Sequence, residues 1–300
     1  MLKKIHLDSF ALKLVAILTM TIDHIGFALG SYYGFRNGNI SMTIDIFRSI
    51  GRIAFPLFCF MICEGAIHTK NFKKYILRMG IMAFLILLAD LALNFLPIFQ
   101  GIGMDTMESI NIYIDLILGA VAVYCLMNKK IYIKLLSLLP LLYSIVCHIF
   151  AVYETMHPST TIWVIPFFLR PEYGFFGILL CISFYLCYLI KGIWFKNESE
   201  KAGVPEEAIK NEDTERLVIN LFSIMVLLVC VSIYYVTLYY IDPIELNVVP
   251  PTYSVFAGAF ILFYNGKRGY NRKWFQYGCY LYYPVHILII FGIFELISLI

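Results

Sequence analysis

The sequence contains little charge. Asp, Glu, Lys and Arg make up 14% of the 300 residues, whereas soluble proteins carry about 25%. Hydrophobic residues reach 61%, and the mean hydropathy is +0.80. The net charge of +3 is spread between apolar runs and forms no basic face, so nucleic acid is not expected as a partner. The composition excludes a soluble domain and predicts an all-α, polytopic membrane protein.

Three kinds of motif are also missing. No C-x-x-C pair occurs, and the eight cysteines fall in or beside apolar runs, where a free thiol behaves as a small hydrophobe. We therefore expect neither disulfides nor a bound metal. No glycine-rich phosphate loop is present, which excludes that mode of nucleotide binding. No internal repeat is evident, and this weighs mildly against a transporter.

Long apolar runs fill the chain instead. A helix needs about 20 apolar residues to span a bilayer, and by this measure residues 1–300 form one membrane domain of about nine transmembrane helices. The eighth is the shortest, because prolines at its start remove helix donors. The predicted helices are Phe10–Leu29, Ile44–Ile67, Tyr75–Leu96, Ile110–Met127, Ile131–Val152, Tyr173–Phe195, Leu217–Ile241, Val248–Tyr264 and Tyr277–Leu299.

The basic residues predict the orientation. Every Lys and Arg falls on one side of the predicted bundle, apart from Arg36, Arg48, Arg52 and Arg170. Because positively charged loops face the cytoplasm, we expect the amino terminus in the cytoplasm and the carboxyl terminus outside. Residues 196–216 mix both signs of charge and predict a solvated cytoplasmic linker.

The first helix carries Asp23 and His24 inside its apolar stretch. An ionisable pair at membrane depth is costly and marks a functional site by default. The pair also argues against a cleaved signal peptide, whose apolar region is normally uncharged. Lys13 lies eleven residues before His24, close to three helical turns, so the two share a stripe about 16 Å long.

Other helices place ionisable groups at a similar depth. Counted along the helix, His24 lies roughly 20 Å from the cytoplasmic edge, in the outer half of the bilayer. The same count puts Arg52, Asp90, Asp115 and His148 in the outer third. Opposite charges at one depth can neutralise each other, which predicts that Arg52 pairs with Asp115 or Asp90. The alternative is that these groups only hold the bundle together.

Two further groups are expected nearer the cytoplasm. His286 lies toward the cytoplasmic end of the last helix, and Tyr282, four residues earlier, can meet it on one helical face. Glu64, on the second helix, can extend its carboxylate to the interface.

Five stretches resemble the TraX family of membrane proteins, and together they cover nearly the whole chain. They are LKLVAILTMTIDHIG (12–26), GRIAFPLFCFMICEG (51–65), NIYIDLILG (111–119), EYGFFGILL (172–180) and KWFQYGCYLYYPVHILII (273–290).

The resemblance implies an activity and its substrates. The named member of the family acetylates the amino terminus of conjugative pilin, which implies acetyl-CoA as donor and a peptide amine as acceptor. A looser likeness joins the chain to membrane acyltransferases with an arginine upstream of a catalytic histidine in the first helix, and the matching positions are Lys13 and His24. Lysine keeps the charge but lacks the bidentate fork that suits phosphate.

The residues themselves suit this chemistry. Acyl transfer to an amine needs a base, and imidazole, here His24, is the commonest one. We expect Asp23 to orient the ring or stabilise imidazolium, and Arg52 to hold the oxyanion or the donor's phosphates. The expected cofactor contacts are Lys13, Lys273 and His286. Polar groups expected at the substrate or in structural roles are Glu64, Asp90, Asn111, Asp115, Tyr173 and Tyr283.

The expected protein is thus a multi-pass acyltransferase of the cytoplasmic (inner) membrane, surrounded by lipid. It would move an acetyl group from cytoplasmic acetyl-CoA to an exported peptide or small amine at the outer side. Because the charged nucleotide cannot cross hydrocarbon, the donor would thread inward between helices from Lys13 toward His24. The alternatives are a transporter or flippase, which uses intramembrane charges equally well, and a non-enzymatic assembly factor for a surface appendage.

Overall fold

The computed structural model describes residues 6–33, 38–95, 111–157, 159–241, 251–270 and 272–298. Within these ranges the regular elements are helices, and one β-bridge joins Leu7 to Tyr264. The chain is therefore an all-α protein. The elements are α1 (Ser9–Tyr33), α2 (Gly38–Gly51), α3 (Ala54–His68), α4 (Phe72–Phe95), α5 (Ile112–Leu126), α6 (Ile131–Leu135), α7 (Leu138–Met156), η3 (Phe167–Leu169), α8 (Gly174–Ala202), α9 (Glu206–Ile209), α10 (Glu212–Ile241), η4 (Pro251–Phe256), α12 (Ala257–Leu262) and α13 (Lys273–Ser298).

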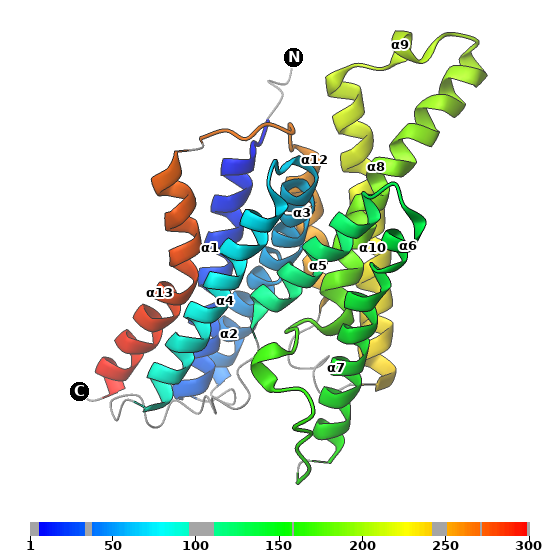
Figure 1. Cartoon of the computed structure of the whole chain (residues 1–300). Coiled ribbons are helices and arrows are strands. Elements are labelled where there is room, and N and C mark those ends of the chain that lie inside the picture. The colour runs from blue at the N-terminus through cyan, green and yellow to red at the C-terminus, as the bar shows by residue number, and fades with distance from the viewer. Residues whose placement is uncertain are drawn as a thin grey trace.

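Helices long and apolar enough to cross a membrane form the bundle. Six such segments occur among the described residues, and α5 and η4–α12 are shorter apolar helices. Figure 1 shows α1 and α13 side by side and running in the same direction, so the chain enters and leaves the bundle at opposite ends. The chain is therefore a multi-pass membrane protein. Each predicted helix has a helical counterpart, and the count of nine spans stays a prediction.

The second predicted helix is broken in two, and Pro56 explains the break. A proline ring clashes with the carbonyl four residues before it, which here belongs to Arg52. The chain responds with a tighter turn between α2 and α3, in which the Ile53 amide donates to the carbonyl of Ile50 at 3.2 Å. Arg48 lies in the last turn of α2, and Arg52 lies in the turn between the two helices.

The linker predicted at residues 196–216 is shorter than expected. Helix α8 continues to Ala202 and ends at Gly203, whose φ of +65° is the left-handed conformation that glycine favours at a helix end. Helix α10 begins at Glu212 with three acidic residues in its first turn, where they complement the helix dipole. Figure 1 shows the ends of α8 and α10, with α9 between them, projecting beyond the other helices. Only residues 203–211 therefore form the connection.

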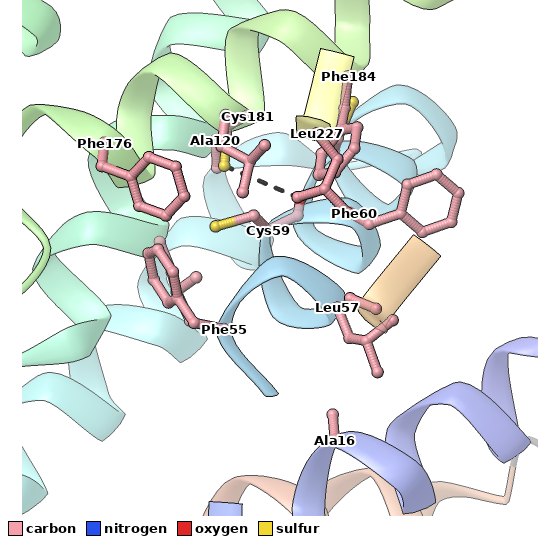
Figure 2. Close-up of a cluster of buried hydrophobic side chains, with 14 of the residues drawn as sticks. Ala16, Phe55, Leu57, Cys59, Phe60, Ala120, Phe176, Cys181, Phe184 and Leu227 are labelled. Carbon is pink, nitrogen blue, oxygen red and sulfur yellow. Dashed lines mark hydrogen bonds between the residues drawn. The ribbon is translucent and has the colours of Figure 1, made fainter. Parts of the chain in front are cut away.

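The buried core lies where α3, α5, α8 and α10 meet. Figure 2 shows phenylalanines from α3 and α8 packing around Cys59 and Cys181, and the Cys181 thiol donates to the carbonyl of Cys59 at 3.8 Å. Close packing and small residues hold helices together in lipid, where the hydrophobic effect does not. Gly119 of α5 shows this, because a Cβ there would come within 2.6 Å of the Cys181 sulfur. All eight cysteines are free, as predicted.

The start of α1 is fixed by its own cap and by the loop before α13. The Asp8 carboxylate accepts from the amide of Ala11 at 2.8 Å, which satisfies one donor of the first turn. The amide of Ser9 donates to the carbonyl of Lys267 at 2.8 Å. α1 and α13 thus begin at the same level. Helix α13 continues through Pro284, which lies in its interior.

Candidate functional site

Asp23 of α1 binds Arg48 from the last turn of α2 and Arg52 from the turn that follows. Its carboxylate accepts from Arg48 Nη1 at 2.5 Å and from Arg52 Nη2 at 3.1 Å. All three side chains are largely buried, and their charges compensate each other away from water. Two guanidinium groups meet the Asp23 carboxylate, and Glu172 also lies close enough to both arginines to interact with them electrostatically.

The position of Arg52, which binds Asp23, corrects the predicted pairing with Asp115. Asp115 is 1% exposed and accepts from the backbone amides of Glu172 at 2.6 Å and Tyr173 at 3.2 Å, just before α8. It thereby satisfies amides at a helix start. Asp90 lies in α4, but its side chain lies outside the described residues. Depth alone could not choose between three carboxylates, because it says nothing of which helices are neighbours.

His24 contacts His286 of α13 and not the neighbouring Asp23. The Nδ1 atom of His24 lies 2.6 Å from Nε2 of His286, and the two rings are nearly parallel, at 17°, with their centroids 4.8 Å apart. His286 Nδ1 in turn lies 2.8 Å from the carbonyl oxygen of Tyr282. We expected Asp23 to orient the His24 ring, but the ring is in contact with His286.

His286 lies deeper than predicted. The sequence placed it toward the cytoplasmic end because the apolar run was counted from Tyr277, whereas α13 begins at Lys273. The longer helix adds about 6 Å at 1.5 Å per residue, which brings His286 to the level of His24. The expected contact of Tyr282 with His286 is confirmed, since their rings stack with centroids 4.9 Å apart. His286 consequently belongs to the histidine pair and does not line the cavity described next.

A cavity of about 500 Å³ leads from one end of the bundle toward this pair. Its wall comes from α1, α3, α4, α5 and α13, and Tyr113 and Tyr283 lie at its deep end. The Tyr283 ring packs edge-on against His24, at 6.1 Å between centroids, and against His286, at 5.5 Å. The cavity thus stops one aromatic ring away from the histidines.

Basic side chains gather at the other end of the cavity. Lys13, Arg78 and Arg268 all line it, and Lys13 lies on the same helix as His24. The predicted stripe from Lys13 to His24 therefore follows the cavity wall. Lys273, expected beside Lys13, is exposed at the start of α13 and does not line the cavity.

Glu64 reaches the cavity wall as one member of a buried ion pair. Its carboxylate accepts from Arg216 Nη1 at 2.7 Å and Nη2 at 3.2 Å, and the Tyr188 hydroxyl also donates to it. Arg216 stacks over the ring of Tyr264, which lies outside the helices and lines the cavity. Burial raises the pKa of Tyr264, so this phenol stays neutral at physiological pH.

The other predicted polar residues have structural contacts. The side chain of Asn111 caps α5 by accepting from the amide of Tyr113 at 3.1 Å, and it donates to the carbonyl of Ala83 at 2.8 Å. Tyr173 stacks on Phe55 with the ring centroids 3.6 Å apart. Neither lines the cavity. His148 of α7 packs near Gly174, away from the histidine pair.

Sequence reasoning missed Arg48 and Arg216. Arg48 lies one helical turn before Arg52, and this spacing of four residues could have indicated a shared partner. Arg216 was assigned to the linker because charged residues precede it, although it begins the apolar run of α10. Among the described residues, no three His, Cys, Asp or Glu side chains lie close enough to hold a metal ion.

Comparison with known proteins gives two matches. The family model described as "TraX protein" matches residues 9–202, which include Asp23, His24 and Arg52. The chain is also similar to a probable fimbrial assembly protein FimC, serogroup H1, of Dichelobacter nodosus, with 33% identity over 79 residues. That match covers 26% of this chain and spans about 30% of the relative's length. No solved structure matches.

Proposed function

The chain belongs to the TraX family, and from this premise we propose that it is a membrane-embedded N-acyltransferase of the cytoplasmic membrane. It moves an acetyl group from acetyl-CoA in the cytoplasm to an amine at the outer side. The amine belongs to an exported peptide or a small molecule. Acetyl-CoA acts as the donor substrate, and the proposed reaction needs no metal ion.

The cavity is the observation that carries the proposal. Its mouth holds Lys13, Arg78 and Arg268, which suit the phosphates of a nucleotide. Its deeper wall is mostly apolar, with tyrosine hydroxyls along it, as suits a slender chain with amide groups. Lys13, at the cavity mouth, and His24, beyond its deep end, lie about 16 Å apart along α1. A donor with a charged head and a long thin arm therefore fits both ends of this space.

The groups at the deep end fit acyl transfer. His24 can take a proton from the attacking amine. The guanidinium groups of Arg48 and Arg52 lie close enough to interact electrostatically with His24, and they can stabilise a negative charge that develops on the thioester oxygen. Tyr283 separates the cavity from the histidines, so its ring must turn aside before the thioester reaches His24.

The orientation of the chain determines the sides of donor and acceptor. The basic connections at the end of the bundle where α1 begins favour a cytoplasmic position for that end and for the cavity mouth. His24 then lies in the outer half of the membrane, where an exported amine can reach it. The likeness to a fimbrial assembly protein supports a subunit of a surface appendage as the acceptor.

Sealed inside-out vesicles test the proposal, because they expose the cytoplasmic face. Acetyl-CoA added to the bath should acetylate a peptide trapped in the lumen and should spare a membrane-impermeant peptide left in the bath. Mass spectrometry of both peptides, with chromatography of the CoA released, measures the transfer. Acetylation of the bath peptide alone would contradict the assigned sides, and no release of CoA under any condition would contradict the enzyme itself.

His24→Ala is the matched variant for this assay. Loss of a general base typically lowers the rate about 10²–10⁴-fold, and the variant should insert and fold normally because His24 is half-buried. Transfer at the wild-type rate in His24→Ala would remove His24 from the mechanism. Transport of a solute with no CoA release would favour a transporter instead.

A further inference from the structure

A chain of three hydrogen-bonding groups ends at His24. The carbonyl oxygen of Tyr282 lies 2.8 Å from His286 Nδ1, and His286 Nε2 lies 2.6 Å from His24 Nδ1. A carbonyl can only accept, so the proton on His286 is at Nδ1. In a neutral imidazole the other nitrogen then has no proton and must accept. His24 therefore donates from Nδ1 and keeps the lone pair of Nε2.

We infer that His286 is a positioning residue that fixes the tautomer of His24 and so selects Nε2 as the atom that accepts the substrate's proton. This inference rests on the proposed function. The same logic orients any catalytic or metal-binding histidine, because the partner of one ring nitrogen decides the state of the other. Here the partner is His286 of α13, 262 residues after His24 in the sequence.

The geometry leaves little freedom in this arrangement. His286 is 3% exposed; the Tyr282 ring lies parallel to it with the centroids 4.9 Å apart, and the His24 ring meets its edge through the 2.6 Å contact between ring nitrogens. Tyr282 is itself held by Thr21 of α1, since their hydroxyl oxygens lie 2.7 Å apart. Thr21 also donates to the carbonyl of Ile17, so it accepts from Tyr282. α1 and α13 are thus joined by the Thr21–Tyr282 contact as well as by the histidine pair.

When His24 carries its proton at Nδ1, its Nε2 can take the proton of the amine and pass it to the leaving thiolate. A neutral amine attacks the thioester carbon, a new C–N bond forms, and the amine proton passes to Nε2 of His24. The C–S bond then breaks, and the thiolate leaves with its electron pair. The proton moves from Nε2 to the sulfur, which gives the free thiol and the N-acetyl product. His24 returns to the Nδ1-protonated form, and His286 neither gains nor loses a proton.

The tautomer itself can be measured without turnover. Nitrogen-15 NMR of labelled histidine distinguishes protonated from unprotonated ring nitrogens, and His24→Gln identifies the His24 signals by their loss. We expect His24 to be protonated at Nδ1 and unprotonated at Nε2 in the wild type. A proton at Nε2, or protons at both nitrogens, would overturn the inference. Because this readout needs no substrate, it stands even if acetyl-CoA proves not to be the donor.

Two substitutions of His286 separate positioning from packing. His286→Leu removes the acceptor, so turnover of acetyl-CoA should fall about 10²-fold or more, as when a catalytic histidine loses its tautomer, while KM for the donor changes little. His286→Gln keeps an oxygen near the position of Nε2 and should restore most of that loss. Nitrogen-15 spectra should show the Nδ1 proton of His24 kept in the glutamine variant.

A histidine of α7, His148, provides the control for the substitutions of His286. His148→Leu replaces a half-buried histidine of α7 that packs near Gly174, and it should leave turnover unchanged. Equal loss in the leucine and glutamine variants, with the NMR signals of His24 unaltered, would overturn positioning as the role of His286. Full activity in His286→Leu would overturn it as well.

Discussion

At the scale of single residues, the two arginines beside Asp23 use different donors. Arg52 donates from Nη2 to Asp23 at 3.1 Å and from Nε to the carbonyl of Arg48 at 3.4 Å. Arg48 donates to the other carboxylate oxygen at 2.5 Å. The cluster therefore depends on the planar shape of guanidinium as well as on its charge.

Arg52→Lys should lower activity more than charge conservation suggests. A lysine ammonium cannot reach Asp23 and the Arg48 carbonyl in the geometry of the fork, and one lost hydrogen bond to a charged group costs about 1.5–3 kcal/mol, or tenfold and more in rate. Rates of CoA release by purified protein measure the effect. The exposed Arg272→Lys serves as control and should match the wild type. Full activity in Arg52→Lys would reassign Arg52 to packing of the bundle.

Gly51 gives a second test of the same cluster. A Cβ at this position would collide with the Asp23 carboxylate, so Gly51→Ala should displace Asp23 and separate it from both arginines. We expect a lower melting temperature and a loss of turnover. Gly80→Ala in α4 is the matched control, because no heavy atom lies within 4 Å of the added Cβ and alanine favours a helix by about 1 kcal/mol. Equal melting temperatures for the two variants would show that α2 can move away from Asp23.

At the scale of helices, the start of α10 is tied to the cavity wall. Arg216, in the first turns of α10, makes two hydrogen bonds to Glu64 of α3, and Lys191 of α8 binds Glu215 at 2.7 Å. The side chains of Glu64 and Arg216 are 9% and 14% exposed. The projecting ends of α8 and α10 are thus coupled to the mouth of the cavity through this pair.

Arg216→Gln should be strongly destabilising. It leaves the Glu64 carboxylate buried without its cation, and breaking one side of a buried ion pair costs about 3–5 kcal/mol in the free energy of unfolding. Unfolding by denaturant in detergent measures the loss. Adding Glu64→Gln should restore part of it, because the uncompensated charge is then removed.

An exposed ion pair on the same arm provides the control for Arg216. Lys196 lies 3.9 Å from Glu200 on α8, and both side chains are about two-thirds exposed. Lys196→Gln should therefore change the free energy of unfolding by less than about 1 kcal/mol. A similarly small effect of Arg216→Gln would mean that water reaches Glu64 through the cavity mouth.

At the scale of the whole molecule, the alternation of connections sets the topology. Lys129 lies between α5 and α6, and Thr160 lies between α7 and α8. The positive-inside rule predicts that the first faces the cytoplasm and the second the outside. In intact cells, an impermeant maleimide should label Thr160→Cys and should label Lys129→Cys only after the membrane is opened. Serine at Cys125 and Cys279, the two less buried cysteines, removes background. Labelling of Lys129→Cys in intact cells would reverse the orientation.

Composition and apolar run length predicted the all-α membrane fold, because a bilayer admits few other spanning structures. They could not predict the break at Arg52, since Pro56 lies inside a run that is long enough for one helix. His24 was identified because charge is rare at membrane depth. Its partner was not, because pairing depends on which helices are neighbours, and α1 and α13 are 262 residues apart at the histidine pair. Arg216 was missed because the charged residues before it placed it in the predicted linker.

Pro284 has an effect on the cavity wall as well as on the helix that contains it. Proline has no amide hydrogen, so the carbonyl four residues earlier, that of Tyr280, lacks its helical donor. Tyr280 lies on the wall of the cavity. Pro284 therefore interrupts the backbone hydrogen-bond pattern of α13 at a residue of the cavity wall, whereas a helix without proline would keep that pattern unbroken across the membrane.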